Sequence, residues 1–174
     1  MSDPRYPIGP FLPPTAYTPE LREGFIGQIA EAPARLRMAV KGLTEAQLLT
    51  PYRDGGWSVA QVVHHVPDSH MNAYVRFKLA ITEDRPTIKA YDEARWAELP
   101  DASVADLSAS LTLLESLHRR WVVFLRRLTG EQFERTLQHP ELGTVSLNRY
   151  AALYAWHGRH HVAHVTALRE RMRW

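Results

Sequence analysis

Four long stretches of this 174-residue chain carry an apolar residue at every third or fourth position, the spacing of one face of an α-helix. Three of them begin at residues that favour helix N-caps, namely Thr18, Ser58 and Ser146. Patterns of alternating apolar and polar residues, which are typical of strands, are almost missing. The predicted helices cover residues 19–41, 59–83, 107–129 and 147–171.

Four amphipathic helices bury their apolar faces most simply against one another, so we predict an all-α four-helix bundle. Residues 84–106 form a longer connection with one short helix around Asp92–Leu99, so the helices need not simply alternate up and down. Pro33 inside the first helix predicts a kink or a break. Gly130 is expected to close the third helix.

Six of the twelve prolines fall within the first 19 residues, and proline favours extended backbone. We therefore predict an extended, proline-rich N-terminal arm over residues 1–17. Its aromatic and aliphatic side chains indicate that the arm lies against the body of the protein or against a partner subunit. No repeat or linker divides the remainder, so we expect a single domain over residues 1–174, with the helical bundle in residues 18–174.

Composition excludes several classes of protein. The chain has no cysteine, which excludes disulfides, thiolate nucleophiles, iron–sulfur clusters and cysteine-bound zinc. The net charge is only +2 and acidic residues are interspersed with basic ones, so we expect no nucleic-acid partner. No apolar run approaches the roughly 20 residues of a membrane helix, and the first residues do not resemble a signal peptide. We expect a cytoplasmic protein without membrane contacts.

Histidine is the unusual residue: the chain has nine, and four of them lie between His157 and His164. At about 100° per residue, His157 and His161 fall on the apolar stripe of the last predicted helix. A pair at i and i+4 can chelate one cation, because both rings project from the same face. His160 and His164 have the same spacing, but His160 lies at the edge of the stripe. A lone histidine on such a face is usually a hydrogen-bonded core residue, whereas four within eight residues favour a metal site.

A third ligand must come from another helix, and His64 and His65 are the candidates; spacing alone does not choose between them. Asn72 and Arg76 lie on the same side of the helix as His65. This polar row either faces solvent or lines a wet pocket that has His65 at its inner end.

Other metal architectures fit less well. Carboxylate-bridged di-iron bundles need two Glu-x-x-His pairs, and only Glu115 and His118 match. In an H-E-x-x-H protease motif the glutamate would stand at Gly158. Three neutral imidazoles with open coordination positions remain, and they suit zinc or nickel.

Several segments closely resemble the YfiT-like branch of the DinB superfamily. They are Tyr6-Pro-Ile-Gly9, Pro51-Tyr-Arg-Asp-Gly-Gly-Trp57, His64-His65, Asp68-Ser-His-Met-Asn72, Arg76-Phe-Lys78 and Trp156-His157-x-x-His160-His161-x-Ala-His164. The resemblance spans nearly the whole chain. It implies a bundle of the DinB type, usually a homodimer, with one divalent metal, zinc or nickel, per chain. It also implies that the metal ligands are His65, His157 and His161. Pro67 departs from the pattern, and we expect it to shift His65 slightly.

The leading hypothesis is an enzyme whose metal activates water for hydrolysis or a low-molecular-weight thiol for transfer to a small-molecule substrate. The resemblance implies a metal-dependent hydrolase or a bacillithiol-like S-transferase. Asn72 and Arg76 would contact the substrate or the thiol, unless they are simply solvent-exposed. His164 would be a hydrogen-bonding partner of a ligand, a proton shuttle or a core residue, and His118 a structural one. The alternatives are a non-catalytic metal or small-molecule binding module and a bundle that the metal only braces.

Overall fold

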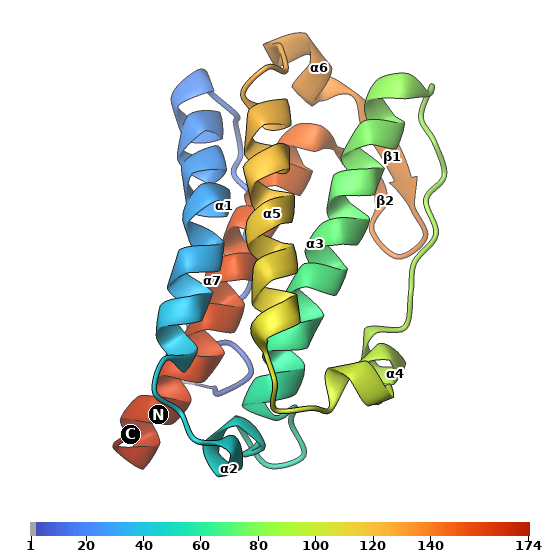
Figure 1. Ribbon diagram of the computed structural model, residues 1–174. Helices are drawn as coiled ribbons and strands as arrows, with labels where there is room; N and C mark the ends of the chain where they lie inside the picture. Colours follow the sequence, from blue (N-terminus) through green and yellow to red (C-terminus); the bar gives the residue numbers. More distant parts are fainter. Residues whose placement is uncertain (1–2) are drawn as a thin grey trace.

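The computed structural model describes residues 3–174, and four long helices form its body (Figure 1). They are α1 (Pro19–Val40), α3 (Val59–Thr82), α5 (Ser108–Leu125) and α7 (Leu147–Met172). Each packs on two others, so that the order around the bundle is α1, α5, α3, α7. The four-helix bundle predicted from the apolar periodicity is confirmed.

The chain follows the bundle in an order that the long connection makes possible. In Figure 1, α1 and α7 run downward while α3 and α5 run upward, and the connection between α3 and α5 returns along the outside of the bundle. It contains α4 (Glu93–Trp96) and the short 3₁₀ helix η1 (Pro100–Ala102). Parallel neighbours therefore alternate with antiparallel ones around the bundle.

Local signals set most helix ends. Thr18, Ser58 and Ser146 each accept a hydrogen bond from a backbone N–H in the first turn of the helix that follows, and Ser58 forms a full capping box with Gln61. The short helix α2 (Glu45–Leu48) begins with a capping box at Thr44. The first helix continues through Pro33 without a break.

One expectation was wrong, and one small element was not predicted. The third long helix ends at Leu125, and Gly130 is instead the first residue of a separate helix, α6 (Gly130–Glu134), which Thr129 caps. The chain also contains a small antiparallel hairpin of β1 (Thr136–His139) and β2 (Gly143–Ser146). Leu137 and Val145 face each other in this hairpin and are fully buried. Four-residue strands are too short for alternation to stand out in the sequence.

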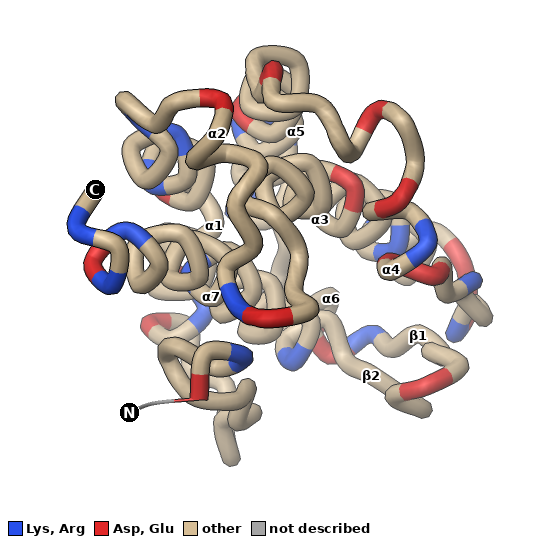
Figure 2. The backbone as a smooth tube through the Cα atoms, turned by 90° about the horizontal axis from the view of Figure 1, so that it is seen from below, with Lys and Arg blue, Asp and Glu red and all other residues tan. Residues whose placement is uncertain are grey.

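The described part of the N-terminal arm, residues 3–17, contains no helix or strand and lies alongside α7 (Figure 2). The Trp156 indole N–H donates a hydrogen bond to the Gly9 carbonyl, and the rings of Phe11 and Trp156 are 5.9 Å apart. The arm therefore packs against the body of the protein, as its apolar side chains predicted. Residues 1 and 2 lie outside the described residues.

The core consists of two apolar clusters with a polar layer between them. One cluster surrounds Trp121 and Phe77, and the other surrounds Leu114 and Leu36. On α3, α5 and α7 the boundary between the clusters is occupied by buried histidines: His65, His70, His118, His160, His161 and His164. This layer is where the bundle concentrates its buried polar groups.

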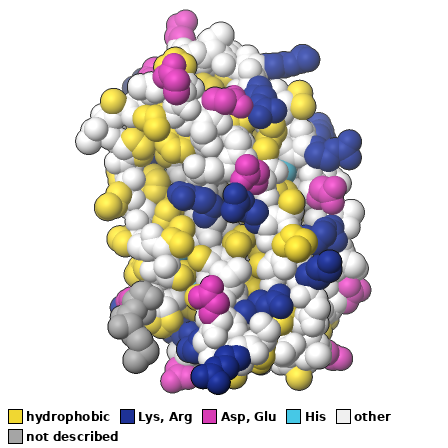
Figure 3. Space-filling view, turned by 90° about the vertical axis from the view of Figure 1, so that its left-hand side faces the viewer, with side chains coloured by type: hydrophobic (Ala, Val, Ile, Leu, Met, Phe, Trp, Pro, Cys, Tyr) yellow, Lys and Arg dark blue, Asp and Glu magenta, His cyan; other side chains and the backbone are white. Residues whose placement is uncertain are grey.

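On the face drawn in Figure 3, basic and acidic side chains are interspersed among apolar ones. Within residues 3–174, no helix combines the length and the apolar character that crossing a membrane requires.

Candidate metal centre

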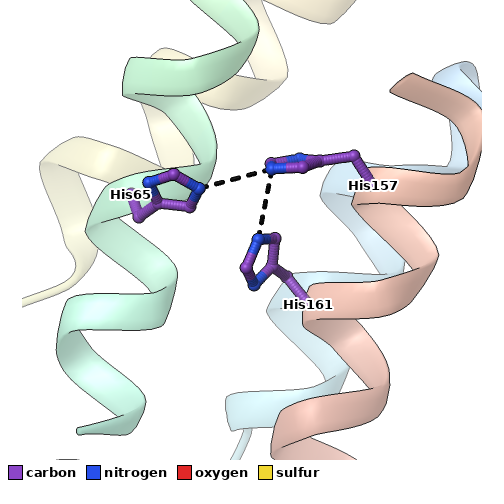
Figure 4. A group of neighbouring side chains, drawn as sticks. All are labelled: His65, His157 and His161. Carbon is purple, nitrogen blue, oxygen red and sulfur yellow. Dashed lines mark hydrogen bonds between the residues drawn. The ribbon is translucent and has the colours of Figure 1, made fainter. Parts of the chain in front are cut away.

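Three imidazoles from two helices converge inside the histidine layer (Figure 4). His65 comes from α3, and His157 and His161 come from successive turns of α7. The Nε2 atom of His157 lies 3.3 Å from Nε2 of His65 and 3.2 Å from Nε2 of His161. Nitrogens of all three rings lie within 4.8 Å of one another. The structure thus brings together the three histidines that the sequence singled out.

The spacing of these nitrogens fits one cation. Zinc binds histidine nitrogens at about 2.0–2.1 Å, so two ligands of a tetrahedral zinc ion lie about 3.3–3.4 Å apart. The two closest N···N distances, 3.2 and 3.3 Å, agree with that value. A cation about 2 Å from each ring would still have room for a further ligand, because only three nitrogens take part.

Burial keeps these rings in the form that binds metals. Desolvation and the neighbouring imidazoles hold the pKa values of His157 and His161 well below the usual range. Desolvation, assisted by His164, lowers the pKa of His65 to about 4. All three are therefore neutral near pH 7, and a neutral imidazole can donate a lone pair to a cation without first losing a proton.

Spacing left His64 and His160 open as alternative ligands; the structure places His64 outside the cluster and His160 beside it, with its ring centre 5.2 Å from that of His161. Both ring nitrogens of His64 have partners outside the cluster: Nδ1 lies 2.7 Å from Ser110 Oγ, and Nε2 lies 2.9 Å from the Val104 carbonyl. His160 stacks on Trp156 with ring centres 4.2 Å apart. Helix α3 continues through Pro67. The effect of this proline on coordination stays a prediction.

A cavity of about 350 Å³ opens beside the three histidines. Its wall includes Ser69 and Arg76 from α3 and Tyr91 from the connection between α3 and α5. The hairpin holds that connection in place, because Ile88 N–H donates to the Gln138 carbonyl of β1 and Gln138 N–H donates to the Pro86 carbonyl. The small hairpin that the sequence did not reveal therefore shapes this cavity.

Arg76 is the one lysine or arginine among the residues that line the cavity, whose wall also includes the carboxylates of Glu93 and Glu141. Its guanidinium donates to the Tyr150 hydroxyl at 2.8 Å and to the Lys89 carbonyl at 2.7 Å, and its side chain is only 6% exposed. Among residues 3–174 it has no ion pair with a carboxylate. A buried cation with only neutral partners is costly, and an anionic ligand in the cavity would offset that cost.

Asn72 has a different environment. Its side-chain amide donates to the Asp68 carbonyl of its own helix at 2.9 Å, and the residue does not line this cavity. The polar row on α3 is therefore divided: His65, Ser69 and Arg76 line the cavity, and Asn72 does not. Tyr91 went unnoticed in the sequence because it belongs to an irregular segment without periodicity.

A second cavity, of about 300 Å³, lies on the other side of His160 and His161, which line both cavities. The arm and the Asp54-Gly55-Gly56-Trp57 turn form its wall through Tyr6, Tyr52, Gly55 and Trp57. The histidine cluster is thus flanked by space on two sides.

The fold and the site define a class: a four-helix bundle that holds an open, histidine-lined candidate metal centre. Comparison with known proteins agrees with it. Residues 28–165 match the model of the DinB superfamily. Two curated relatives, from Bacillus cereus strain 03BB102 and Bacillus thuringiensis, are each 54% identical over the full length of both chains and are named "Putative metal-dependent hydrolase". This chain belongs to the DinB superfamily.

Solved structures give the same result for the fold. YfiT from Bacillus subtilis, described as a "probable metal-dependent hydrolase with an unusual four-helix bundle topology", superposes with a TM-score of 0.95 at 49% identity and 98% coverage of both chains. The four-helix bundle protein TT2238 superposes with a TM-score of 0.58 at 16% identity, covering 84% of this chain and 98% of its own, and supports the fold alone. The resemblance to the YfiT-like branch is confirmed.

Proposed function

We propose that this protein is a metal-dependent hydrolase in which His65, His157 and His161 hold one divalent cation, zinc or nickel. The observation that carries the proposal is the convergence of three neutral imidazoles, two of them 3.2 and 3.3 Å from Nε2 of His157 and all three within 4.8 Å of one another, beside a cavity of about 350 Å³. The names of the full-length relatives support the same chemistry. A bound divalent cation supplies Lewis acidity, which lowers the pKa of a nucleophile in an open coordination position.

The residues of the cavity wall orient the substrate. Arg76 offers its unpaired positive charge to a carboxylate or phosphate, and Tyr150 and the Lys89 carbonyl hold the guanidinium in place. Burial raises the pKa of Tyr91, so its hydroxyl stays protonated and can donate a hydrogen bond to the substrate. Asn72 would contribute only to the part of a larger substrate that extends beyond the cavity.

A low-molecular-weight thiol is the second nucleophile that the resemblance implies, which would make the protein an S-transferase. The chain has no cysteine, so such a thiol would enter as a cosubstrate. The cavity would then hold the thiol and the electrophile in turn or together. A cytoplasmic homodimer remains part of the proposal.

The first experiment measures the metal. Protein purified without added metal or a histidine tag is analysed for its elements beside His65→Ala and the matched control His64→Gln. We expect close to one zinc or nickel per chain in the wild type and in His64→Gln, and little in His65→Ala. Equal metal in all three would refute the assigned ligands.

The second experiment measures the reaction. Zinc- and nickel-loaded protein is incubated with small esters with and without a carboxylate, and separately with a thiol and a model electrophile, and the products are followed by mass spectrometry. We expect ester hydrolysis that is lost in His161→Ala and kept in His64→Gln. Thiol conjugates without hydrolysis would replace the hydrolase by the transferase. Metal binding with no product above background in either arm would favour a non-catalytic binding module.

A further inference from the structure

Beyond the three candidate ligands, two more buried histidines continue into the core in a line. His157 Nδ1 lies 3.0 Å from Nε2 of His70, His70 Nδ1 lies 2.8 Å from Nε2 of His118, and His118 Nδ1 lies 2.6 Å from the Ile29 carbonyl. His70 and His118 are 0% and 2% exposed. We call this set, His157, His70 and His118, the long histidine chain.

The Ile29 carbonyl, at the far end of the long histidine chain, fixes the direction of every hydrogen bond in it. A carbonyl oxygen can only accept, so His118 donates from Nδ1. In a neutral ring the other nitrogen then accepts, so His118 Nε2 accepts from Nδ1–H of His70. By the same reasoning, His70 Nε2 accepts from Nδ1–H of His157. The remaining nitrogen, Nε2 of His157, is left with a lone pair, and this is the atom that faces His65 and His161.

The sequence explains why the Ile29 carbonyl is free to accept. In a helix, this carbonyl would pair with the backbone N–H of the residue four positions later, and that residue is Pro33, which has no N–H. Helix α1 continues through Pro33, so the carbonyl stays buried and needs a donor from elsewhere. Nδ1 of His118, on the neighbouring helix α5, supplies it.

A shorter chain of the same kind ends at His161. His164 Nε2 lies 3.2 Å from the Arg5 carbonyl in the N-terminal arm, and His164 Nδ1 lies 3.4 Å from Nδ1 of His161. The carbonyl again makes His164 donate from Nε2, so its Nδ1 accepts from Nδ1–H of His161. His161 is therefore also left with a lone pair on Nε2.

We propose that His70 and His118 are positioning residues that hold His157 in its metal-binding tautomer, and that His164 does the same for His161. The inference rests on the proposed metal site. The lone pairs on Nε2 of His157 and Nε2 of His161, whose atoms are 3.2 Å apart, repel each other. A cation between the two nitrogens removes this repulsion, because both lone pairs then bind it. The two chains of hydrogen bonds thus orient the rings before the metal binds, so metal binding costs less conformational entropy.

The experiment breaks and then restores the chain at its far end, where His118 touches no metal. His118→Leu removes both hydrogen bonds. His118→Gln keeps an N–H for Ile29 and an oxygen for His70, about as far apart as the two ring nitrogens. His64→Leu is the matched control, because it removes a buried histidine that also makes two hydrogen bonds but lies outside both chains.

Metal affinity is the first readout, measured by competition with a chromophoric chelator. Loss of a hydrogen-bonding partner of a metal ligand costs about 10–100-fold in affinity. Because His118 acts on His157 through His70, we expect a loss at the lower end of that range, about tenfold, in His118→Leu, and values within about threefold of the wild type in His118→Gln and His64→Leu. Equal affinity in all four proteins, or equal losses in His118→Leu and His64→Leu, would overturn the proposal.

The second readout is the tautomer of each ring in the metal-free wild type, from long-range ¹H–¹⁵N NMR correlations. We expect a protonated Nδ1 and a bare Nε2 on His157. A protonated Nε2 on His157 would refute the long histidine chain even if His118→Leu failed to fold. This measurement needs neither metal nor turnover, so it can fail while the proposed function stands, and it can succeed if the function proves different.

Discussion

Acidifying the metal-free protein from pH 7 to pH 5 should lower its free energy of unfolding by about 4 kcal/mol through His65 and His118 alone. Burial lowers the pKa of each ring to about 4, from 6.5 for an ordinary histidine. Below pH 6.5 the unfolded chain therefore binds protons that the folded chain does not. The stabilisation is fully present above pH 6.5 and is lost as the pH falls from 6.5 toward 4. Each histidine contributes roughly 1.4 kcal/mol per pH unit in that window, or roughly 2 kcal/mol between pH 6.5 and 5.

The assay is urea unfolding followed by circular dichroism at pH 7, 6 and 5, with a chelator present. His118→Gln removes one of the two titrating groups but keeps its hydrogen bonds, so its loss of stability should be smaller than that of the wild type by about 2 kcal/mol. The other buried histidines, whose pKa values burial also lowers, act in the same direction and add to this decrease. A decrease below about 1 kcal/mol in the wild type, or an unchanged decrease in His118→Gln, would refute the reasoning.

Three further predictions concern packing, metal binding and substrate charge. Gly158→Val should lower the free energy of unfolding, measured with urea, by about 1–3 kcal/mol, because a Cβ at Gly158 lies 3.0 Å from the Ala32 Cβ. Gly27→Ala should instead raise it by up to about 1 kcal/mol, because the space around Gly27 is open and alanine favours a helix. Zinc at 100 times its Kd should stabilise the wild type by about 2.7 kcal/mol, seen as a higher Tm, and His161→Ala should show little of this shift. Arg76→Met should raise KM for a carboxylate-bearing substrate about tenfold or more and leave a neutral analogue nearly unchanged, as steady-state kinetics would show; equal effects on both would contradict the role of Arg76.

Local sequence patterns account for the helices and for two of the three candidate ligands. Caps such as Thr18 and Ser58 act within one turn, so they can be identified without knowing the fold. The pairing of His157 with His161 is equally local, because four residues along a helix return to the same face. The prediction that Gly130 ends the third long helix was wrong because a glycine can end one helix or begin another. Here the capping box at Thr129 makes Gly130 the first residue of α6.

The rest of the site depends on contacts between distant segments. Neither the sequence pattern nor the spacing distinguishes His64 from His65, since the rotation of α3 against α7 decides which ring meets His157. Arg76 lines the cavity and Asn72 does not, because of the same rotation and because the connection between α3 and α5 covers one side of α3.

The chain by itself determined that four helices form and that histidines occupy the middle of the last one, because these properties depend on neighbours within a turn or two. The sequence also leaves the Ile29 carbonyl without a helical partner, because Pro33 has no N–H. Only the tertiary structure decided that His118 donates to this carbonyl, and that the carbonyl thereby orients a ring three hydrogen bonds away. That arrangement joins α1, α5, α3 and α7. The hydrogen-bonding state of each histidine is set by partners far away in sequence, which no local pattern records.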